Sequence, residues 1–560
     1  MSRRTGKMPS AAVTGRLLLL LALLLAGPAS SFVPPARRGG RTSRAPAPSL
    51  PSHPDGGDAD GPRVVILGGG FGGINAALTL PSLPWPDAVR PRVTLVDRSE
   101  RFVFLPLLYE LCVDDATVDE VAPTFRSLLG GTAGGGQGPV GLPGPGDVLR
   151  TLTGGGRDGS SSDSSAGVEF VRAEVGGIDV PNRRVVVTDA GDGSVSSIEY
   201  DALIVATGAE VSLDAVAGAE GRALPFYTVE DALELRRRLS LVDGLLEGEA
   251  AADDEDGKVA ITVIGGGYSG VELALNLVDR FAGAEREVEV NLVHRGERVL
   301  EYATDYNRRV GTERLEKAGV NVLTGTSVEE VLPGRKDGGD HPLDNYRCSL
   351  RLSTKGEDGG DGGAVESELD TTLLLWTAGS TPTAPENRGI RNSVLPRDSM
   401  GRILTGPTLS VPDHPEVFAI GDCGRVTGRR RYPATAQVAM QMATCAGWNV
   451  CATLSSSDDD NDGGGGGTPP PRLLPFNFVS LGEMMTLGTD DATISTLGGA
   501  LELDGAAASW LRRLVYAARM PTPGQAARAA ADGTGRRIAR GAAGRGRKGR
   551  RRRGKPVEWR

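Results

Sequence analysis

Two segments of the chain repeat one pattern, and this repeat constrains the possible fold more than any other feature. The apolar run Val64–Leu67 leads into Gly68–Gly73, and the apolar run Ala260–Ile264 leads into Gly265–Gly270. Each glycine-rich stretch has the form GxGxxG and is followed by an Ala- and Leu-rich segment with helical spacing. One copy would be weak evidence, whereas two copies between a strand and a helix predict an α/β protein with two Rossmann-type dinucleotide-binding domains.

The glycines of such a turn have separate tasks. The first permits a tight turn, the second lets the backbone approach a pyrophosphate, and the third lets the helix pack on the strand, so that amides at the helix N-terminus meet the anion. The predicted phosphate-binding residues are Gly68, Gly70, Phe71, Gly72 and Gly73 in the first turn and Gly265, Gly267, Tyr268, Ser269 and Gly270 in the second.

The next strand of each fold ends at the residue expected to meet the adenosine ribose. In the first fold this residue is Asp97, followed by Arg98, and a carboxylate there accepts hydrogen bonds from ribose hydroxyls, which suits FAD. In the second fold it is His294, followed by Arg295. Because no acid repels a 2'-phosphate and a guanidinium can pair with it, we expect NADPH to be accepted as well as NADH. An ordinary exposed basic pair is the alternative interpretation.

Charge and cysteine content exclude several classes of site. The 560-residue chain has a formal net charge of -9, yet residues 521–560 hold 13 Lys or Arg and two acidic residues. This basic tail is expected to be disordered, with attachment to anionic lipid as the alternative, and we expect no nucleic-acid partner. The five cysteines have neither CxxC spacing nor the short redox spacing of a flavin disulfide reductase. With only four histidines beside them, no metal site is predicted.

Residues 1–60 have the composition of a targeting leader. Basic residues precede the apolar run Leu17–Ala26, small residues precede Phe32, and a basic segment rich in Ser and Thr follows without an acidic residue before Asp55. A signal peptide followed by such a segment is typical of bipartite leaders for plastids that lie within the secretory system. The leader therefore predicts a plastid protein, with plain secretion as the alternative.

Three further apolar strands end in small-residue turns or an acid, namely Leu203–Gly208, Leu373–Gly379 and Val417–Asp422. Together with the paired glycine-rich turns, they resemble the flavoproteins that have two dinucleotide-binding domains. The resemblance implies that Asp422 binds the ribityl chain of FAD. It also implies cofactor contacts at Val175, Ala206, Thr207, Gly208, Gly421, Ala378 and Gly379.

Within these flavoproteins, the chain resembles the type II NAD(P)H:quinone dehydrogenases. Residues 435–441 contain AQxAxQ, which lies beside the flavin and the quinone channel in that family, and Phe102–Glu110 resembles a loop close to the flavin. Gly270–Ala274 contains the GVE turn, whose Glu approaches nicotinamide and flavin. The resemblance implies an oxidoreductase that uses FAD and takes electrons from NADPH or NADH.

The same resemblance implies roles for a few side chains. Gln437 and Gln441 are expected to orient a quinone carbonyl, and Glu272 to order the nicotinamide or to relay a proton if burial raises its pKa. A solvated helix face is the alternative for Gln441, and an ordinary acid near a helix N-terminus is the alternative for Glu272. Further implied cofactor contacts are Pro106, Thr435 and Ala436.

The runs 99–110, 225–231 and 481–488 resemble the plant plastid branch of this family, and the resemblance covers roughly residues 62–520. It implies a membrane quinone as the electron acceptor, with plastoquinone, phylloquinone and demethylphylloquinone all compatible. It also implies a position peripheral to the thylakoid membrane or at a plastoglobule.

These motifs divide the chain into regions. We predict a leader (1–60), an FAD-binding domain in two parts (61–257 and 381–480), an NAD(P)H-binding domain (258–380), a membrane-association region (481–520) and the basic tail (521–560). In residues 510–520, apolar and basic side chains fall on opposite sides of a predicted helix, which suits an interfacial segment. A core-packing helix or a homodimer contact fits equally well. Beyond the leader no stretch has about 18 apolar residues in a row, so membrane contact is expected to be peripheral.

Two other functions fit parts of the pattern. A sulfide:quinone reductase would need reactive cysteines flanking the flavin, and Cys112 and Cys423 fall near flavin-contacting motifs. A redox sensor or scaffold would bind FAD and NAD(P) with little turnover, but it would not need the AQxAxQ motif.

Overall fold

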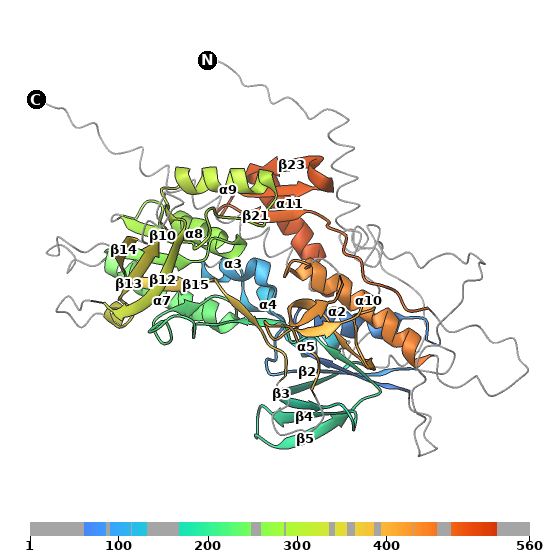
Figure 1. The fold of residues 1–560 in the computed structure, drawn as a ribbon. Coiled ribbons are helices and arrows are strands. Elements are labelled where there is room, and N and C mark those ends of the chain that lie inside the picture. Colours follow the sequence, from blue (N-terminus) through green and yellow to red (C-terminus); the bar gives the residue numbers. More distant parts are fainter. Residues whose placement is uncertain are drawn as a thin grey trace, which may run out of the picture. The chain divides into compact units, whose positions relative to one another are not determined.

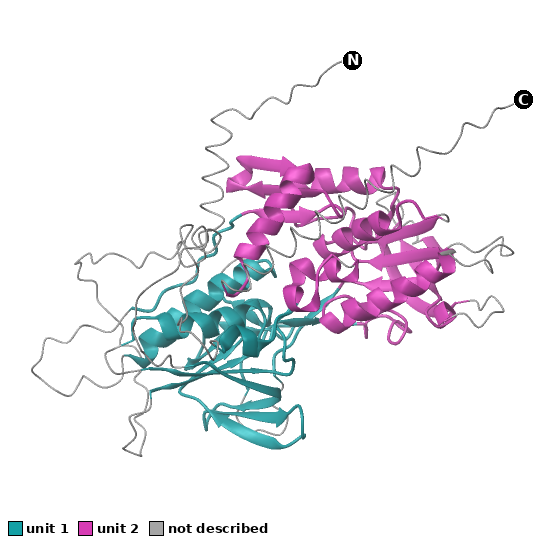
Figure 2. Ribbon diagram, turned by 180° about the vertical axis from the view of Figure 1, so that it is seen from behind, with its two compact units in different colours: residues 1–103, 122–212, 379–481 teal, residues 104–121, 213–378, 482–560 magenta. Residues whose placement is uncertain are grey.

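The fold comes from a computed structural model. The structure describes residues 61–85, 90–113, 115–130, 167–247, 259–284, 287–334, 342–355, 365–385, 394–428, 431–455 and 472–522. The predicted leader, residues 523–560 of the basic tail and most of the Gly- and Asp-rich insertions lie outside these residues. The chain folds into two compact units (Figure 2). Unit 1 comprises 1–103, 122–212 and 379–481, and unit 2 comprises 104–121, 213–378 and 482–560.

Unit 1 is built on an eight-stranded sheet with the order β18-β19-β6-β1-β2-β3-β4-β5. Neighbours from β19 to β3 are parallel, and the pairs at both edges of the sheet are antiparallel. The strands are β1 (Arg63–Leu67), β2 (Arg92–Asp97), β3 (Glu169–Asp179), β4 (Arg184–Asp189), β5 (Val195–Glu199), β6 (Ala202–Val205), β18 (Ser410–Val411) and β19 (His414–Ala419).

The centre of this sheet is apolar on both faces. All residues of β1 from Val64 to Leu67 are at most 1% exposed, as expected for a parallel strand covered on both sides. Helices α2 (Phe71–Thr79) and α10 (Ala436–Leu454) pack against each other beside it (Figure 1). The smaller elements are η2 (Leu80–Ser82), α5 (Phe125–Leu129), η6 (Gly421–Cys423) and the strand pairs β7 (Ala209–Val211) with β16 (Ser380–Pro382) and β17 (Ile403–Thr405) with β20 (Gly424–Val426).

Unit 2 repeats the same design with a five-stranded parallel sheet in the order β11-β10-β9-β15-β8. Its strands are β8 (Leu224–Pro225), β9 (Val259–Ile264), β10 (Val288–Val293), β11 (Asn321–Leu323) and β15 (Leu373–Trp376), and a second, antiparallel sheet joins β12 (Thr326–Pro333), β13 (Cys348–Thr354) and β14 (Val365–Thr371). Its helices are η3 (Leu105–Leu107), α3 (Leu108–Cys112), α4 (Val118–Val121), α7 (Val229–Glu247), α8 (Tyr268–Phe281), α9 (Asp305–Lys317) and η5 (Pro342–Asn345).

The last described part of the chain completes unit 2. Strands β21 (Glu483–Thr486), β22 (Ala492–Thr496) and β23 (Leu501–Asp504) form an antiparallel sheet, with η7 (Leu497–Gly499) between the last two, and helix α11 (Gly505–Ala518) follows. The expected separation of apolar and basic residues on this helix is wrong for Arg512, because Arg512 is buried together with Leu511 and Val515. Within the described residues, no helix has the length and apolar character needed to cross a membrane.

Candidate active site

The first glycine-rich turn joins β1 to α2 and has the geometry of a phosphate cradle. Gly68 has a φ of +93°, and a Cβ on Gly73 would lie 1.7 Å from the carbonyl oxygen of Gly68, so a side chain at Gly73 has no room. No atom of the described part of the chain lies within 4 Å of a Cβ placed on Gly70. Helix α2 has neither a side-chain cap nor an acidic residue in its first turn. Its N-terminal amides are therefore available to an anion.

Asp97 closes this turn from the end of β2. Its Oδ2 accepts a hydrogen bond from the Gly69 amide at 2.6 Å, and its Oδ1 accepts one from the Ser99 amide at 2.7 Å. Burial raises the pKa of Asp97, and the two amide hydrogen bonds oppose that shift. The following residue, Arg98, is exposed and pairs with Glu210.

The other predicted flavin contacts gather at the same edge of the unit 1 sheet. Ala206, Thr207 and Gly208 follow β6, and Gly421 and Asp422 follow β19; both strands run parallel to β1. Because carboxyl ends of parallel strands meet at one edge, these turns adjoin the first glycine-rich turn. Val175 lies on β3, three residues beyond the partner of Asp97, and Thr435 and Ala436 begin α10.

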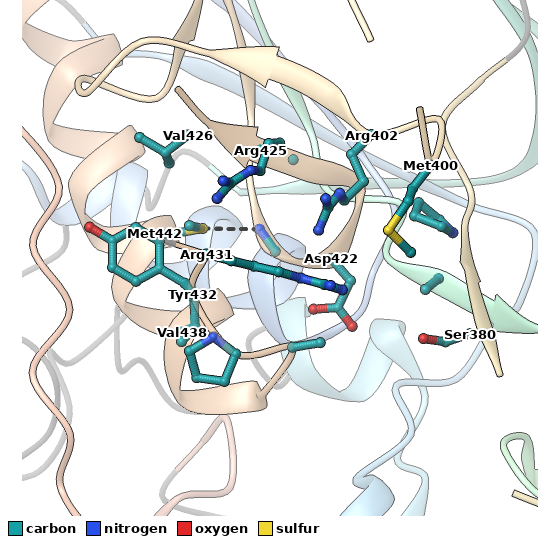
Figure 3. Close-up of a pocket in the computed structure, with 16 residues that line it drawn as sticks. Ser380, Met400, Arg402, Asp422, Arg425, Val426, Arg431, Tyr432, Val438 and Met442 are labelled. Carbon is teal, nitrogen blue, oxygen red and sulfur yellow. Dashed lines mark hydrogen bonds between the residues drawn. The ribbon is translucent and has the colours of Figure 1, made fainter. Parts of the chain in front are cut away.

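Asp422 lines a cavity in unit 1 (Figure 3). Arg402, Arg425, Arg431 and Tyr432 line the same cavity, and the guanidinium of Arg431 lies beside the carboxylate of Asp422. Burial raises the pKa of Asp422, and the charge of Arg431 opposes the shift. The cavity joins a carboxylate that can accept hydroxyl hydrogen bonds to cations that can meet phosphate oxygens. The arginines carry no sequence motif, which is why the sequence did not reveal them.

The second glycine-rich turn joins β9 to α8 with closely similar geometry. Gly265 has a φ of +117°, and a Cβ on Gly270 would lie 1.8 Å from the carbonyl oxygen of Gly265. Gly267 has open space where a Cβ would stand, and α8 has neither a side-chain cap nor an acidic residue in its first turn. Ala378 follows β15, which is parallel to β9, whereas Gly379 begins the next segment of unit 1.

His294 occupies in the second turn the place that Asp97 occupies in the first. Its Nδ1 accepts a hydrogen bond from the Gly266 amide at 3.2 Å, just as Asp97 accepts one from Gly69. Burial lowers the pKa of His294, so the imidazole is neutral and carries its proton on Nε2. That buried Nε2 has no hydrogen-bond partner among the described residues. Arg295 beside it is exposed. The second turn is thus held without an acidic group.

Glu272 lies on α8, two residues beyond the last glycine of the second turn. Its side chain is 9% exposed, and its Oε1 accepts a hydrogen bond from the Thr486 amide at 2.9 Å. Burial raises the pKa of Glu272 to about 7; the Thr486 amide and the charge of Arg512 oppose the shift, and the charge of Glu110 adds to it. Glu272 therefore has the raised pKa that a proton relay requires.

A buried ionic cluster around Arg512 neighbours Glu272. Arg512 is 1% exposed; its Nη2 donates to Glu110 Oε1 at 3.0 Å, and its guanidinium lies 5.7 Å and 5.1 Å from the ring centroids of Tyr109 and Tyr516. Arg513 pairs with the other oxygen of Glu110 at 3.1 Å. The Nε and Nη1 groups of Arg512 are buried without a partner among the described residues. Sequence reasoning missed this cluster entirely. The predicted contact Pro106 lies nearby in the chain, on η3.

Both predicted glutamines lie near the N-terminus of α10 and bond to backbone. The Nε2 of Gln441 donates to the carbonyl oxygen of Val479 at 2.8 Å, and the Val479 amide donates to Gln441 Oε1 at 3.0 Å. The Leu481 amide donates to Gln437 Oε1 at 3.1 Å. Their predicted contact with a quinone stays a prediction.

Comparisons with known proteins show the family to which the chain belongs. The model of the family described as pyridine nucleotide-disulphide oxidoreductase matches residues 62–443. The chain is 33% identical to demethylphylloquinone reductase NdbB of Synechocystis sp., over 82% of this chain and 93% of that protein. It is 36% identical to alternative NAD(P)H-ubiquinone oxidoreductase C1, chloroplastic/mitochondrial, of Arabidopsis thaliana, over 82% of this chain and 78% of that protein. The fold resembles NDH2 from Plasmodium falciparum in complex with NADH, with a TM-score of 0.63 and 16% identity over 84% and 97% of the two chains.

Two dinucleotide turns, each at the carboxyl edge of a parallel sheet, define an oxidoreductase that uses a flavin and a nicotinamide nucleotide. The chain belongs to the pyridine nucleotide-disulphide oxidoreductase family and, within it, to the type II NAD(P)H:quinone oxidoreductases. Its cofactors are FAD and NAD(P)H.

Proposed function

We propose that this protein takes electrons from NADPH or NADH, through FAD, and delivers them to a membrane quinone of the plastid. The observation that carries the proposal is the difference between the two glycine-rich turns, one closed by the carboxylate of Asp97 and the other by the neutral imidazole of His294. This difference supports the placement of FAD in unit 1 and of the nicotinamide nucleotide in unit 2. The quinone follows from the similarity to two relatives whose names specify quinone reduction.

The residues of unit 1 fit FAD. The open space at Gly70 and the uncapped N-terminus of α2 suit the pyrophosphate, Asp97 suits a ribose, and Asp422 in its cavity suits the hydroxyls of the ribityl chain. The chemistry that FAD supplies when bound is acceptance of a hydride and release of two electrons. The protein contributes position and electrostatics around it.

Glu272 is proposed to hold a proton close to the nicotinamide site. Reduction of a quinone to a quinol takes up two protons as well as two electrons. A carboxyl group with a pKa of about 7 is protonated in part of the molecules at neutral pH, so it can give a proton and regain it. Its position one turn from the N-terminus of α8 places this group next to the nucleotide turn.

The structure gives no support to the sulfide:quinone reductase alternative. All five cysteines are buried as free thiols. Burial raises the pKa of the Cys423 thiol, whereas a reactive cysteine needs an accessible thiolate. Cys112 donates weakly to backbone carbonyls of Leu108 and Ala232 and is fully buried.

A peripheral position at a plastid membrane belongs to this proposal. One relative is named chloroplastic/mitochondrial. In unit 2, the Trp510 side chain on α11 is 57% exposed and Leu497 at the β22–β23 connection is 48% exposed, and both suit shallow contact with lipid. The natural quinone among plastoquinone, phylloquinone and demethylphylloquinone, and a homodimer, stay predictions.

Arg295→Ala is expected to raise the KM for NADPH about 10- to 100-fold, because one charge-assisted hydrogen-bonding group to the 2'-phosphate is lost. The KM for NADH should stay within about twofold. Steady-state oxidation of both nucleotides by the flavin-loaded enzyme, with a soluble quinone as acceptor, measures this. Arg298→Ala, at an exposed neighbouring arginine, is the matched control. Equal losses with the two nucleotides would refute the assignment of the 2'-phosphate site.

A further inference from the structure

A stripe of side chains on α10 holds an extended segment of unit 1, residues 472–481, which we call the strap. Within the described residues, the strap belongs to neither a helix nor a strand. Five side chains of α10 form hydrogen bonds with the backbone of the strap. Gln437 accepts from the Leu481 amide, and Gln441 bonds to both the amide and the carbonyl of Val479. Cys445 donates to the Leu474 carbonyl, Trp448 donates to the Arg472 carbonyl, and Asn449 bonds to both the amide and the carbonyl of Leu474.

The spacing of the stripe explains why the strap runs along the helix. Positions 437, 441, 445 and 448–449 recur every three or four residues and so lie on one face of α10. Strap numbers rise as helix numbers fall, so the two run antiparallel. Gln441 and Asn449 each offer a donor and an acceptor to one residue, Val479 and Leu474. The side chains thus take the place of a neighbouring strand.

These bonds let the strap present apolar surface. A backbone whose N–H and C=O groups are already paired does not lose hydrogen bonds to water when an apolar molecule covers it. Val479 is 51% exposed and Leu473 is 37% exposed, although both are large apolar residues. The exposed apolar side chains therefore lie on a segment whose peptide groups are largely satisfied.

The strap also leads to the cavity that Asp422 lines. The ring of Tyr432 meets Phe476 and Phe478 of the strap edge-on, with centroid distances of 5.0 Å and 6.4 Å. Tyr432 in turn lines the cavity with Asp422, as does Met442 of α10 (Figure 3). Aromatic side chains thus connect the strap to the proposed flavin site.

We propose that the strap is the wall along which the apolar tail of the quinone lies, and that Gln441 is a positioning residue that holds this wall through Val479. The proposal rests on the proposed quinone reduction. It assigns Gln441 a role different from contact with the quinone carbonyl, since both ends of its amide already bond to Val479. An isoprenoid tail is the occupant that fits, because it offers no hydrogen bond and needs none from the strap.

The test compares full-length, flavin-loaded wild type with Gln441→Met, which keeps the length of the side chain and removes both hydrogen bonds. The two acceptors are a decyl-tailed plastoquinone analogue and a tail-less benzoquinone. We expect the ratio of the KM values, tailed over tail-less, to rise about tenfold, since one lost interaction of this kind is a tenfold change. Hydrogen exchange at the Val479 amide, which loses its acceptor on Gln441, should become at least about tenfold faster. Thr444→Val, whose hydroxyl bonds within α10 to Met440, is the control expected to change neither.

An equal rise in both KM values would overturn the proposal in favour of contact with the quinone head. Faster exchange without a change in the KM ratio would overturn the role of the strap in tail binding, and unchanged exchange would show that Gln441 does not hold the strap. If wild type reduces neither quinone, the proposed function fails, while hydrogen exchange still reports whether Gln441 holds the strap. Gln441→Glu keeps the acceptor for the Val479 amide and should give an intermediate KM ratio, so a poorly folded Met variant leaves a second test.

Discussion

Arg512→Met is expected to lower the free energy of unfolding by about 3–5 kcal/mol, because it leaves the carboxylate of Glu110 buried without its nearest cation. The side chains of Arg512 and Glu110 are 1% and 5% exposed, so neither charge is compensated by water. Met keeps most of the packing volume, and the loss therefore reports on the charge. Equilibrium urea unfolding of wild type and variant measures it.

Two further variants separate the ion pair from its surroundings. Arg513→Met should cost clearly less, since Arg513 is 18% exposed and its charge remains partly solvated. The double variant Glu110→Gln/Arg512→Met should regain part of the lost stability, because no buried carboxylate then remains that has lost one of its two arginine partners. Equal losses in the single and double variants would show that packing, and not the buried charge, accounts for the effect of Arg512.

Glu272→Gln is expected to change how stability depends on pH. The folded-state pKa of Glu272 is raised to about 7, so folding favours the protonated carboxyl. Its contribution is fully present below the unfolded pKa of about 4.3 and is lost as pH rises towards 7. At about 1.4 kcal/mol per pH unit over this window, wild type should lose roughly 3 kcal/mol that the Gln variant does not lose.

Urea unfolding at intervals between pH 4.5 and pH 8, with the Gln variant as the reference for all other titrating groups, measures this difference. The groups that act on Glu272 are Glu110, Arg512 and the Thr486 amide, and all are retained in the variant. Parallel stability curves for the two proteins would mean that Glu272 titrates as an ordinary exposed carboxylate, and its proposed role in holding a proton would then fail.

The glycine-rich turns could be predicted because their information is local. A strand, three glycines and a helix follow one another within residues 63–79 and again within residues 259–281, and the close approach of Gly73 to Gly68 requires the absence of a side chain whatever surrounds it. The acid or its replacement at the end of the next strand follows from the same short unit. Parallel pairing of β1 with β2 and of β9 with β10 then brings Asp97 and His294 to their turns.

The remaining parts of the site depend on contacts that no local pattern encodes. Arg512 meets Glu110 across 402 positions of the chain, and helical spacing alone places an arginine towards solvent. The expected interfacial face of α11 was wrong at that residue for this reason. Gln441 was recognised by its motif, but its bonds to Val479, 38 positions away, were not visible in the sequence. The arginines around Asp422 likewise come from separate segments: Arg425 lies on β20, and Arg402 and Arg431 lie outside helices and strands.

The most direct measurement of the central claim is an anaerobic double-mixing experiment on the flavin-loaded protein. NADPH is added first and a plastoquinone analogue second, while flavin absorbance is followed. The proposed function predicts that NADPH bleaches the flavin and that the quinone restores its colour at least as fast as steady-state turnover, with one quinol formed per NADPH. A flavin that NADPH reduces but quinone does not reoxidise would contradict the account and favour a protein that binds FAD and NAD(P) with little turnover.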